Sequence, residues 1–178
     1  MKLPIITERL ILRKITSADL DDLFLLDSNP EVVKYVGIKP FTKKEETLHL
    51  IECLLNQYEK NGTGRLSVIE KETKKFTGWS GIKLFTEKVN GFKNVYELGY
   101  RFLPEFWGKG YATESAKASL GLGFNQFHAD KIYAYADVEN QTSNYILTKL
   151  GFENKGTFLD KGDKCNWYEL QKINYESY

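Results

Sequence analysis

The chain has 178 residues, 42% of them hydrophobic, which is enough to bury one substantial core, and we expect a single domain over residues 1–178. Its 25 Lys and Arg residues are matched by 24 Asp and Glu residues, so we expect no direct binding to nucleic acid or to anionic lipid. Its apolar runs are shorter than the roughly 20 residues that cross a bilayer, and the first ten residues lack a secretory pattern, so we expect a soluble cytoplasmic protein with no membrane partner.

The first third of the chain reads as one strand followed by two helices. Apolar residues alternate between two faces over residues 8 to 15, which predicts a strand. A short capped helix follows and reaches about Asp27. A longer helix is predicted over residues 43 to 60, from an apolar stripe with spacings of three, four and three residues: Leu48, Ile51, Leu55 and Tyr58.

The rest of the chain alternates strands with helices. Strands are predicted over residues 66 to 70, 76 to 85, 95 to 103, 131 to 138, 152 to 158 and 164 to 173. Helices are predicted from about 110 to 127 and from 142 to 150. This order predicts a mixed α/β fold with an antiparallel meander and one strand-helix-strand crossover. Cys53 and Cys165 have no CxxC spacing, so we expect two core residues and neither a disulfide framework nor a metal site.

The stretch FWGKGYATE, residues 106 to 114, joins a predicted strand to a predicted helix. The first backbone N–H groups of such a helix are unpaired and lie at the positive end of its dipole, which favours a phosphate. Gly108 and Gly110 lack a Cβ and let an oxyanion approach the main chain. A Walker A loop does not fit, and a dinucleotide fingerprint fits weakly because Thr113 takes its third glycine position. An ordinary glycine-containing connection is the alternative.

WGKGYA resembles the acyl-CoA pyrophosphate loop of the GNAT superfamily of N-acetyltransferases, whose pattern is [QR]xxGx[GA]. Trp107 stands in the first position, where Gln or Arg is usual, and Gly110 and Ala112 stand in the fourth and sixth. NQTSNYILTKLGF, residues 140 to 152, resembles the superfamily's second signature. WGKGYATE, the opening ITERLILRKITSADLDDLF and the strand YELGYRFLP resemble its RimJ/RimL-like branch. The resemblance covers essentially the whole chain.

The resemblance implies a strongly twisted mixed sheet of six to seven strands, splayed open between strands 4 and 5, with helices on both faces. It implies acetyl-CoA as the cofactor, with its pantetheine arm along an exposed strand edge. A backbone N–H of Phe102 or Leu103 would hold the thioester oxygen, with Gly99 marking a bulge. The implied cofactor-binding residues are Phe102, Leu103, Trp107, Gly108, Lys109, Gly110, Tyr111, Ala112, Thr113, Asn140, Ser143 and Lys149.

Acyl transfer from a thioester to an amine requires a proton acceptor, a polarised carbonyl and a way for the thiolate to leave. Glu97, Gly99 and Arg101 share one face of their predicted strand, and Glu97 is the carboxylate best placed to point into a cleft. By resemblance Glu97 is the catalytic base, and an ion pair with Arg101 is the alternative. Tyr35 and Phe41 are expected to contact the acceptor together with Glu97.

Many GNAT enzymes protonate the leaving sulfur with a tyrosine seven residues after the signature Asn140, but Leu147 stands there in this sequence. By resemblance to RimL-like enzymes, Ser143 takes that catalytic role, and Tyr145 lies nearby on another face of the helix. The alternative for Ser143 is to cap the helix. Asn140 is expected to hold the pantetheine or the start of the helix.

We therefore predict an enzyme, monomeric or homodimeric, that transfers acetyl from acetyl-CoA directly to a primary amine without a covalent intermediate, since no GxSxG motif occurs. The resemblance implies the N-terminal amine of a ribosomal or other protein as acceptor, with polyamines and amino sugars as alternatives. Four acidic residues form either a cation-attracting wall or a solvated helix face: Asp19, Asp21, Asp22 and Asp27. A non-catalytic acyl-CoA-binding module and a dinucleotide-binding protein are the competing functions.

Overall fold

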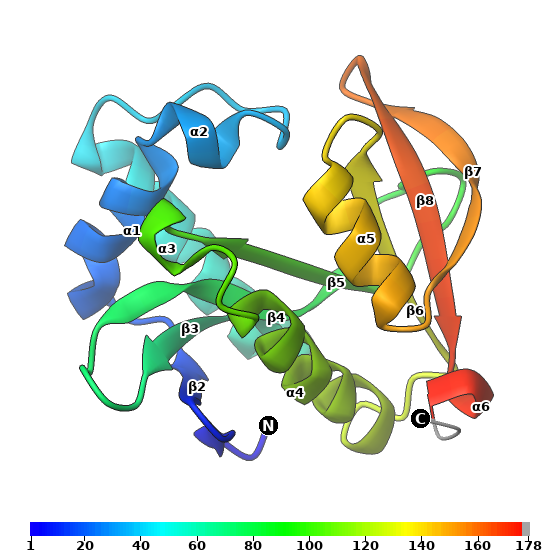
Figure 1. Ribbon diagram of the computed structural model, residues 1–178, viewed down its shortest axis with the longest axis horizontal. Helices are drawn as coiled ribbons and strands as arrows, with labels where there is room; N and C mark the ends of the chain where they lie inside the picture. The colour runs from blue at the N-terminus through cyan, green and yellow to red at the C-terminus, as the bar shows by residue number, and fades with distance from the viewer. Residues whose placement is uncertain (176–178) are drawn as a thin grey trace.

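One eight-stranded sheet runs through the computed structural model, which describes residues 1–175 (Figure 1). Its strand order is β1-β2-β3-β4-β5-β6-β8-β7, and neighbouring strands are antiparallel except β5 and β6, which are parallel. The strands are β1 (Ile5–Ile6), β2 (Leu10–Lys14), β3 (Gly64–Glu70), β4 (Phe76–Phe85), β5 (Val95–Phe102), β6 (Lys131–Asp137), β7 (Glu153–Asp160) and β8 (Asp163–Gln171). The expected fold class is confirmed, and the two-residue β1 adds an eighth strand to the six to seven expected.

Helices lie on both faces of this sheet. They are α1 (Leu20–Asp27), α2 (Pro30–Val33), α3 (Lys44–Asn61), α4 (Tyr111–Asn125), α5 (Gln141–Lys149) and α6 (Lys172–Tyr175), with the 3-10 turns η1 (Ser17–Asp19) and η2 (Pro104–Phe106). In Figure 1, α1, α2 and α3 gather at one side, α5 lies beside β6 and β8 at the other, and α4 runs between them along β4 and β5. Over residues 1–175, no helix combines the length and the apolar character that crossing a membrane requires.

The sheet consists of two well-paired halves that meet at one point. β4 and β5 pair from Gly78↔Phe102 to Phe85↔Val95, and β6 and β8 pair from Lys131↔Gln171 to Asp137↔Cys165. Between the halves, β5 and β6 pair at Glu97↔Tyr133 and diverge beyond it. These two are the fourth and fifth strands predicted from the sequence, so the expected splay is confirmed.

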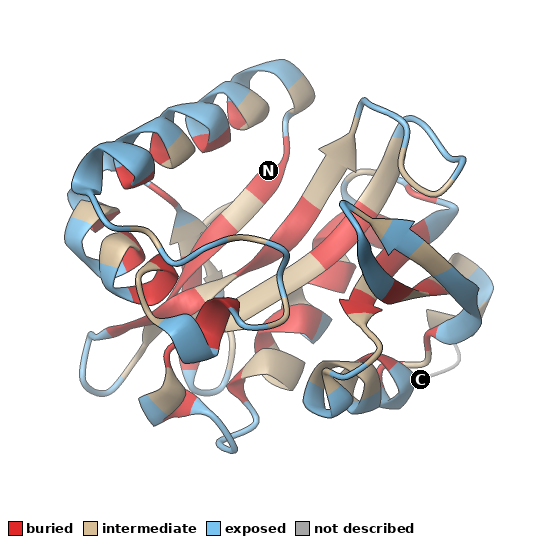
Figure 2. Cartoon of the chain, turned by 90° about the horizontal axis from the view of Figure 1, so that it is seen from above, coloured by how far each residue is buried: buried red, intermediate tan, exposed pale blue. Residues whose placement is uncertain are grey.

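Each half of the sheet has a hydrophobic core of its own, visible as red segments on the central strands in Figure 2. The first core packs under α1 and α3 and includes Leu10, Leu12, Leu23, Ile51 and Leu66. The second packs between α4, α5 and the strands β6 and β8, and includes Ile82, Leu98, Ile132, Ala134 and Leu170. α4 joins the two cores, because it contributes Leu122 to the first and Leu120 and Phe124 to the second.

Small residues let α4 lie close against the sheet. Ala116, Ser119 and Gly123 are buried on its inner face. A Cβ added to Gly123 would lie 2.5 Å from Cδ1 of Ile132 on β6, so a larger side chain does not fit at this crossing. This close packing fixes the N-terminus of α4, where residues 106 to 114 enter the helix.

α3 turns a different face inward from the one predicted. Leu48 and Leu55 are 42% and 38% exposed, and the buried residues are Thr47, Ile51, Leu54 and Tyr58. The orientation is fixed by Tyr58, whose hydroxyl accepts a hydrogen bond from Ile15 N–H at 3.0 Å and donates one to the carbonyl of Arg65. Burial raises the pKa of Tyr58 to about 12, so this hydroxyl keeps its proton.

The same rotation of α3 leaves Cys53 exposed, so the prediction that Cys53 belongs to the core is wrong. Cys165 is buried on β8, as predicted. The short elements β1, α2 and α6 were not predicted from the sequence, because two to four residues carry too little periodicity to stand out.

Candidate active site

A cleft of about 180 Å³ opens where β5 and β6 diverge. One wall comes from β3, β4 and β5, and the other comes from β6, α5, β7 and β8. Because β6 leaves β5 beyond Glu97, the edge of β5 becomes part of the wall, and residues from both faces of this strand reach the cleft. The polar and aromatic lining residues are Tyr35, Arg65, Trp79, Glu97, Tyr100, Arg101, Tyr135, Asp137, Asn140, Ser143, Asp160, Asp163 and Cys165.

Glu97 lies in the cleft wall on β5 and is 4% exposed. Its Oε2 accepts a hydrogen bond from Nη2 of Arg65, in an ion pair between two largely buried side chains. Arg101, the partner considered from the sequence, pairs with Asp27 instead. Arg65 engages Oε2, and the hydrogen bonds described over residues 1–175 do not use the second carboxylate oxygen, Oε1.

Gly99 makes room for the side chain of Arg65. A Cβ at Gly99 would lie 2.5 Å from Nη2 of Arg65 and 2.7 Å from its Cζ. Nη1 of Arg65 also donates to the carbonyl oxygens of Gly81 at 2.6 Å and Glu97 at 3.2 Å. The bulge predicted at Gly99 is wrong, because β4 and β5 pair there in regular register, with Gly81 opposite Gly99.

Trp79 on β4 lies between the two arginines of this wall. Its ring centroid is 5.0 Å from Cζ of Arg65 and 5.2 Å from Cζ of Arg101, distances at which a guanidinium is attracted to the ring. Arg101 pairs with the fully buried Asp27 of α1. Burial raises the pKa of Asp27, and the charge of Arg101 opposes that rise. Both arginines are therefore paired with carboxylates and add no net positive charge to the cleft.

The end of β5 presents a backbone donor to the open edge. Leu103 N–H donates to the carbonyl of Thr77 at 2.9 Å, so it is not available to a thioester oxygen as expected. Successive residues of a strand direct their N–H groups to opposite edges. The N–H of Phe102 therefore points away from β4 and toward the edge that β6 has left. Of the two expected donors, Phe102 and Leu103, Phe102 is the one whose N–H is directed toward the open edge.

The turn at residues 106 to 114 forms the entrance to α4. Gly108 and Gly110 adopt left-handed backbone conformations, with φ of 73° and 80°. No atom of the described chain lies within 4 Å of a Cβ built on Gly108, so the main chain there is open to a ligand. Gly110 caps α4 without a side-chain hydrogen bond, which leaves the first amides of the helix, those of Tyr111, Ala112 and Thr113, for an anion.

Two side chains of this turn point into the protein. Nε1 of Trp107 donates to the carbonyl of Phe102 at 2.7 Å, although Trp107 is 49% exposed. Tyr111 is buried, and its hydroxyl donates to the carboxylate of Glu70 on β3. The backbone of the turn, rather than these side chains, is therefore the part that can face a ligand.

Ser143 on α5 faces Tyr100 on β5 across the cleft. Oγ of Ser143 lies 3.1 Å from Oη of Tyr100. Asn140 caps α5, because its Oδ1 accepts a hydrogen bond from Ser143 N–H at 3.0 Å. The capping role considered for Ser143 thus belongs to Asn140, and the Ser143 hydroxyl is left for other partners. Burial raises the pKa of Tyr100, so its phenol stays protonated and acts as a hydrogen-bond donor.

The other residues expected in the site lie at different places around it. Tyr35 lines the cleft from the loop after α2, whereas Phe41 is outside the set of lining residues. Lys109 is exposed, and its Nζ lies 4.9 Å from the ring centroid of Phe106. Lys149 is exposed in the last turn of α5, at the opposite end of the helix from Asn140.

Three carboxylates give the second wall of the cleft a negative charge: Asp137, Asp160 and Asp163. None of them forms an ion pair with any residue between 1 and 175. Cys165 lies on the same wall, where burial, and then the charges of these three aspartates, raise its pKa to about 11. Because both cleft arginines are paired, the unbalanced charge of the lining residues is negative; Lys83 lies outside this lining, and its ammonium interacts with the charges of Glu97 and Asp160.

Sequence reasoning missed Arg65, Trp79, Tyr100 and Asp137 as residues of the site. Arg65 directly precedes the strand predicted over residues 66 to 70, and its partner on β5 is 32 positions away, which spacing cannot reveal. Tyr100 was placed on the face away from Glu97, and it reaches the cleft because the strand edge itself is exposed.

Comparisons with known proteins agree with this geometry. A model of the acetyltransferase (GNAT) domain family matches residues 9–153. The uncharacterized N-acetyltransferase YoaA of Bacillus subtilis is 31% identical over 150 residues, which cover 84% of this chain and 82% of YoaA. The spermidine N(1)-acetyltransferase of Escherichia coli K12 is 28% identical over 148 residues, 83% of this chain and 75% of that protein. The crystal structure of a GNAT-family acetyltransferase from Bacillus anthracis matches with a TM-score of 0.80 and 26% identity, covering 96% of this chain and 99% of that one.

Proposed function

Because the chain belongs to the GNAT family and is thereby an acetyl-CoA-dependent acyltransferase, we propose that it acetylates a primary amine of a small polycationic acceptor beside Glu97. The observation that carries this proposal is the unbalanced negative charge at Asp137, Asp160 and Asp163. A polyamine has a second ammonium group that these carboxylates can bind while the reacting nitrogen lies near Glu97. The similarity to the E. coli spermidine acetyltransferase supports the same class of acceptor.

Acetyl-CoA supplies an acetyl group that is activated as a thioester. The amides of Gly108 to Thr113 are proposed to bind its diphosphate, and the open edge of β5 its pantetheine arm. The N–H of Phe102 is proposed to polarise the thioester carbonyl. The open space at Gly108 and the uncapped amides of α4 fit such a ligand.

The transfer forms a C–N bond and breaks a C–S bond, while the amine loses a proton and the sulfur gains one. We assign the amine's proton to Oε1 of Glu97, received directly or through a water molecule. Ser143 is proposed to donate a hydrogen bond to the departing sulfur, whose proton then comes from solvent. Tyr100 keeps its proton and donates to the carbonyl of Ser143 at 3.3 Å; its hydroxyl also lies 3.1 Å from Oγ of Ser143, where either oxygen can donate, and a donation from Tyr100 would strengthen Ser143 as a donor to the sulfur.

The test of the acceptor is amine-dependent release of CoA thiol, measured with spermidine, putrescine, an aminoglycoside and short peptides with free N-termini. Spermidine should give the highest kcat/KM of this panel. In the variant Glu97→Gln, kcat/KM should fall by about 100-fold or more, and its rise with pH should flatten. A variant that keeps the wild-type pH profile would remove Glu97 from the role of base.

The charge of the second wall is tested with the double variant Asp160→Asn and Asp163→Asn. KM for spermidine should rise about tenfold or more, and KM for butylamine, which has no second ammonium group, should not change. Asp21→Asn is the control, because Asp21 is exposed on α1 and pairs with Lys44 outside the cleft. An equal effect on both amines would refute the proposed recognition of the second charge.

The N-terminal amine of a protein is the second candidate. Its support is the resemblance of WGKGYATE, and of the opening residues 6 to 24, to the RimJ/RimL-like branch. Peptides that begin with Ala or Ser are the relevant members of the panel, and a higher kcat/KM for them than for spermidine would make this the function. A cytoplasmic location and a monomeric or homodimeric state stay predictions from the sequence.

A further inference from the structure

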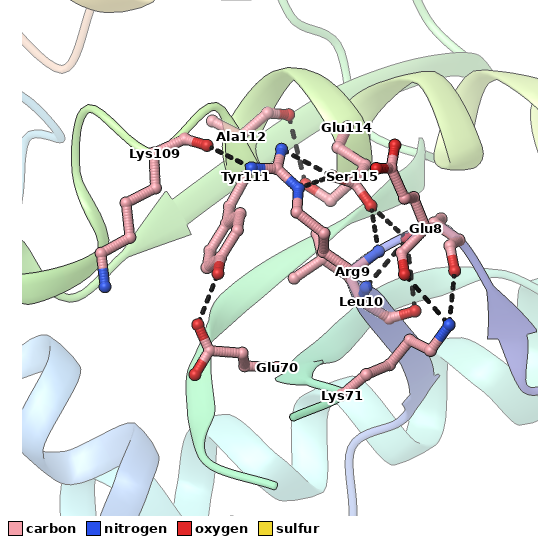
Figure 3. A network of polar contacts seen from close by, with 11 residues as sticks. Glu8, Arg9, Leu10, Glu70, Lys71, Lys109, Tyr111, Ala112, Glu114 and Ser115 are labelled. Carbon is pink, nitrogen blue, oxygen red and sulfur yellow. Dashed lines mark hydrogen bonds and ion pairs between the residues drawn. The ribbon is translucent and has the colours of Figure 1, made fainter. Parts of the chain in front are cut away.

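We propose that Arg9 is a positioning residue for the cofactor: it holds the turn at residues 106 to 114 in an anion-binding shape and neutralises Glu114, without touching the diphosphate. This inference rests on the proposed function, in which that turn binds the diphosphate of acetyl-CoA. Arg9 lies just before β2 and 100 residues away from Lys109. Figure 3 shows its side chain between the turn and the first residues of α4.

The Arg9 side chain is 44% exposed, and all three nitrogen positions of its guanidinium have partners in the turn or in α4. Nη1 donates to the carbonyl of Lys109 at 2.8 Å, and Nε donates to Oε2 of Glu114 at 2.7 Å. Nη2 also lies 2.7 Å from the same oxygen. The guanidinium covers the ring of Tyr111, with Cζ 4.8 Å from the centroid, and a Cβ on Gly110 would lie 3.4 Å from Nη2. Its donors are thus directed at the turn and at α4, which is why we assign it a positioning role.

The bond to Lys109 orients the amide that follows it. In a planar trans peptide the C=O and the next N–H point in opposite directions. When Arg9 holds the carbonyl of Lys109, the N–H of Gly110 is directed away from Arg9. Gly110 has a φ of 80°, and because glycine is conformationally permissive, its backbone could adopt other orientations if the carbonyl of Lys109 were released. Arg9 therefore selects one orientation of the turn.

The bond to Glu114 removes an unfavourable charge. Glu114 lies in the first turn of α4, where a bare carboxylate would repel a bound diphosphate. Burial by itself would raise the pKa of Glu114, but hydrogen bonds from Thr7 and from Arg9 outweigh it and lower the pKa. The carboxylate is therefore ionised at neutral pH, and Arg9 supplies the balancing charge through two nitrogens, Nε and Nη2, that both contact Oε2, an arrangement that the single nitrogen of lysine cannot reproduce.

The experiment compares Arg9→Gln, Arg9→Lys and the double variant Arg9→Gln with Glu114→Gln. The dissociation constant of CoA is measured by calorimetry, so the result does not depend on the acceptor. Arg9→Gln should weaken CoA binding about tenfold or more, and Arg9→Lys should recover only part of the loss. The double variant should bind CoA about threefold or more tighter than Arg9→Gln alone, because the unbalanced carboxylate is gone.

A truncated donor separates positioning from general damage. Acetyl-pantetheine lacks the diphosphate, so Arg9→Gln should leave kcat/KM for it unchanged while kcat/KM for acetyl-CoA falls. Arg13→Gln is the matched control, since Arg13 on β2 is nearly as exposed as Arg9 and also forms an ion pair, and it should leave CoA affinity unchanged.

Three results would overturn the proposal. One is CoA binding by Arg9→Gln within about twofold of the wild type. Another is an equal loss with acetyl-pantetheine, which would indicate structural damage. The third is a double variant that recovers nothing, which would mean that Arg9 binds the diphosphate directly. Gly110→Val distinguishes failure of the role of Arg9 from failure of the proposed function. If Gly110→Val also left CoA binding unchanged, the proposal that this turn binds the diphosphate would itself be wrong.

Discussion

Replacing Gly99 with alanine adds one methyl group, which should displace Arg65 from its contact with Glu97. The Cβ of Gly99→Ala would lie 2.5 Å from Nη2 of Arg65, and the guanidinium has to retreat by about 0.9 Å to reach the 3.4 Å of ordinary contact. Its hydrogen bond to the carbonyl of Gly81, now 2.6 Å, then lengthens, and the contact with Glu97 weakens. Crowding of this size lowers the free energy of unfolding by about 2 kcal/mol. A displacement near 1 Å at a catalytic group costs up to about 100-fold in rate.

The assay measures kcat/KM for the amine at saturating acetyl-CoA, the dissociation constant of CoA, and the free energy of unfolding in urea. We expect Gly99→Ala to lower kcat/KM by about 100-fold while CoA affinity stays at the wild-type value, because the turn at α4 is not involved. Gly121→Ala is the control, since its Cβ would meet Oη of Tyr175 at an ordinary 3.6 Å. If Gly99→Ala keeps wild-type kcat/KM and stability, the account in which Arg65 holds Glu97 in place is refuted.

Three further predictions concern the leaving group, the α4 crossing and the ion pair between Arg13 and the buried Asp19. Ser143→Ala should lower kcat about tenfold or more with little change in CoA affinity, and equal effects on both would leave Ser143 as a binding residue only. Gly123→Val should lower the free energy of unfolding by about 3 kcal/mol in urea titrations, because it collides with Ile132, and a wild-type value would contradict the close crossing. Although burial acts to raise it, the pKa of Asp19 lies below its ordinary value because Arg13 donates to the carboxylate. Asp19→Asn should therefore cost about 2 kcal/mol near pH 7. The difference should start to shrink as the pH falls below about 4, where the unfolded chain takes up the proton, and should vanish only below the lowered pKa of Asp19, where the folded wild type loses the ionised carboxylate.

The strands and helices that could be predicted are those whose signals are local. β4 has the predicted bounds, and α3 ends at Gly62, which takes the left-handed conformation of a helix C-cap with φ of 68°. The face of α3 could not be predicted, because Leu48 and Leu55 continue the apolar spacing as well as Leu54 does. Which stripe is buried depends on where β3 and α1 lie.

The candidate site likewise has features that local sequence predicts and features that depend on how distant segments pack. Glu97 and the uncapped turn at Gly110 follow from residues that are adjacent in sequence, since alternation and helix entry are local properties. The pairing of Glu97 with Arg65 depends on the register of three strands, and so does the need for glycine at Gly99. The contacts of Arg9 depend on packing between the start and the middle of the chain, about 100 residues apart, which no spacing rule contains.

Because β5 and β6 pair at one position, Glu97↔Tyr133, the thermal stability of the protein should depend on the concentration of CoA. The two strands are not paired beyond Glu97↔Tyr133 in the described part of the chain, so a ligand that lies along that edge of β5 would supply contacts that the polypeptide does not make there. By mass action, a ligand at 100 times its dissociation constant stabilises the folded state by about 2.7 kcal/mol. The melting temperature should therefore rise with CoA concentration.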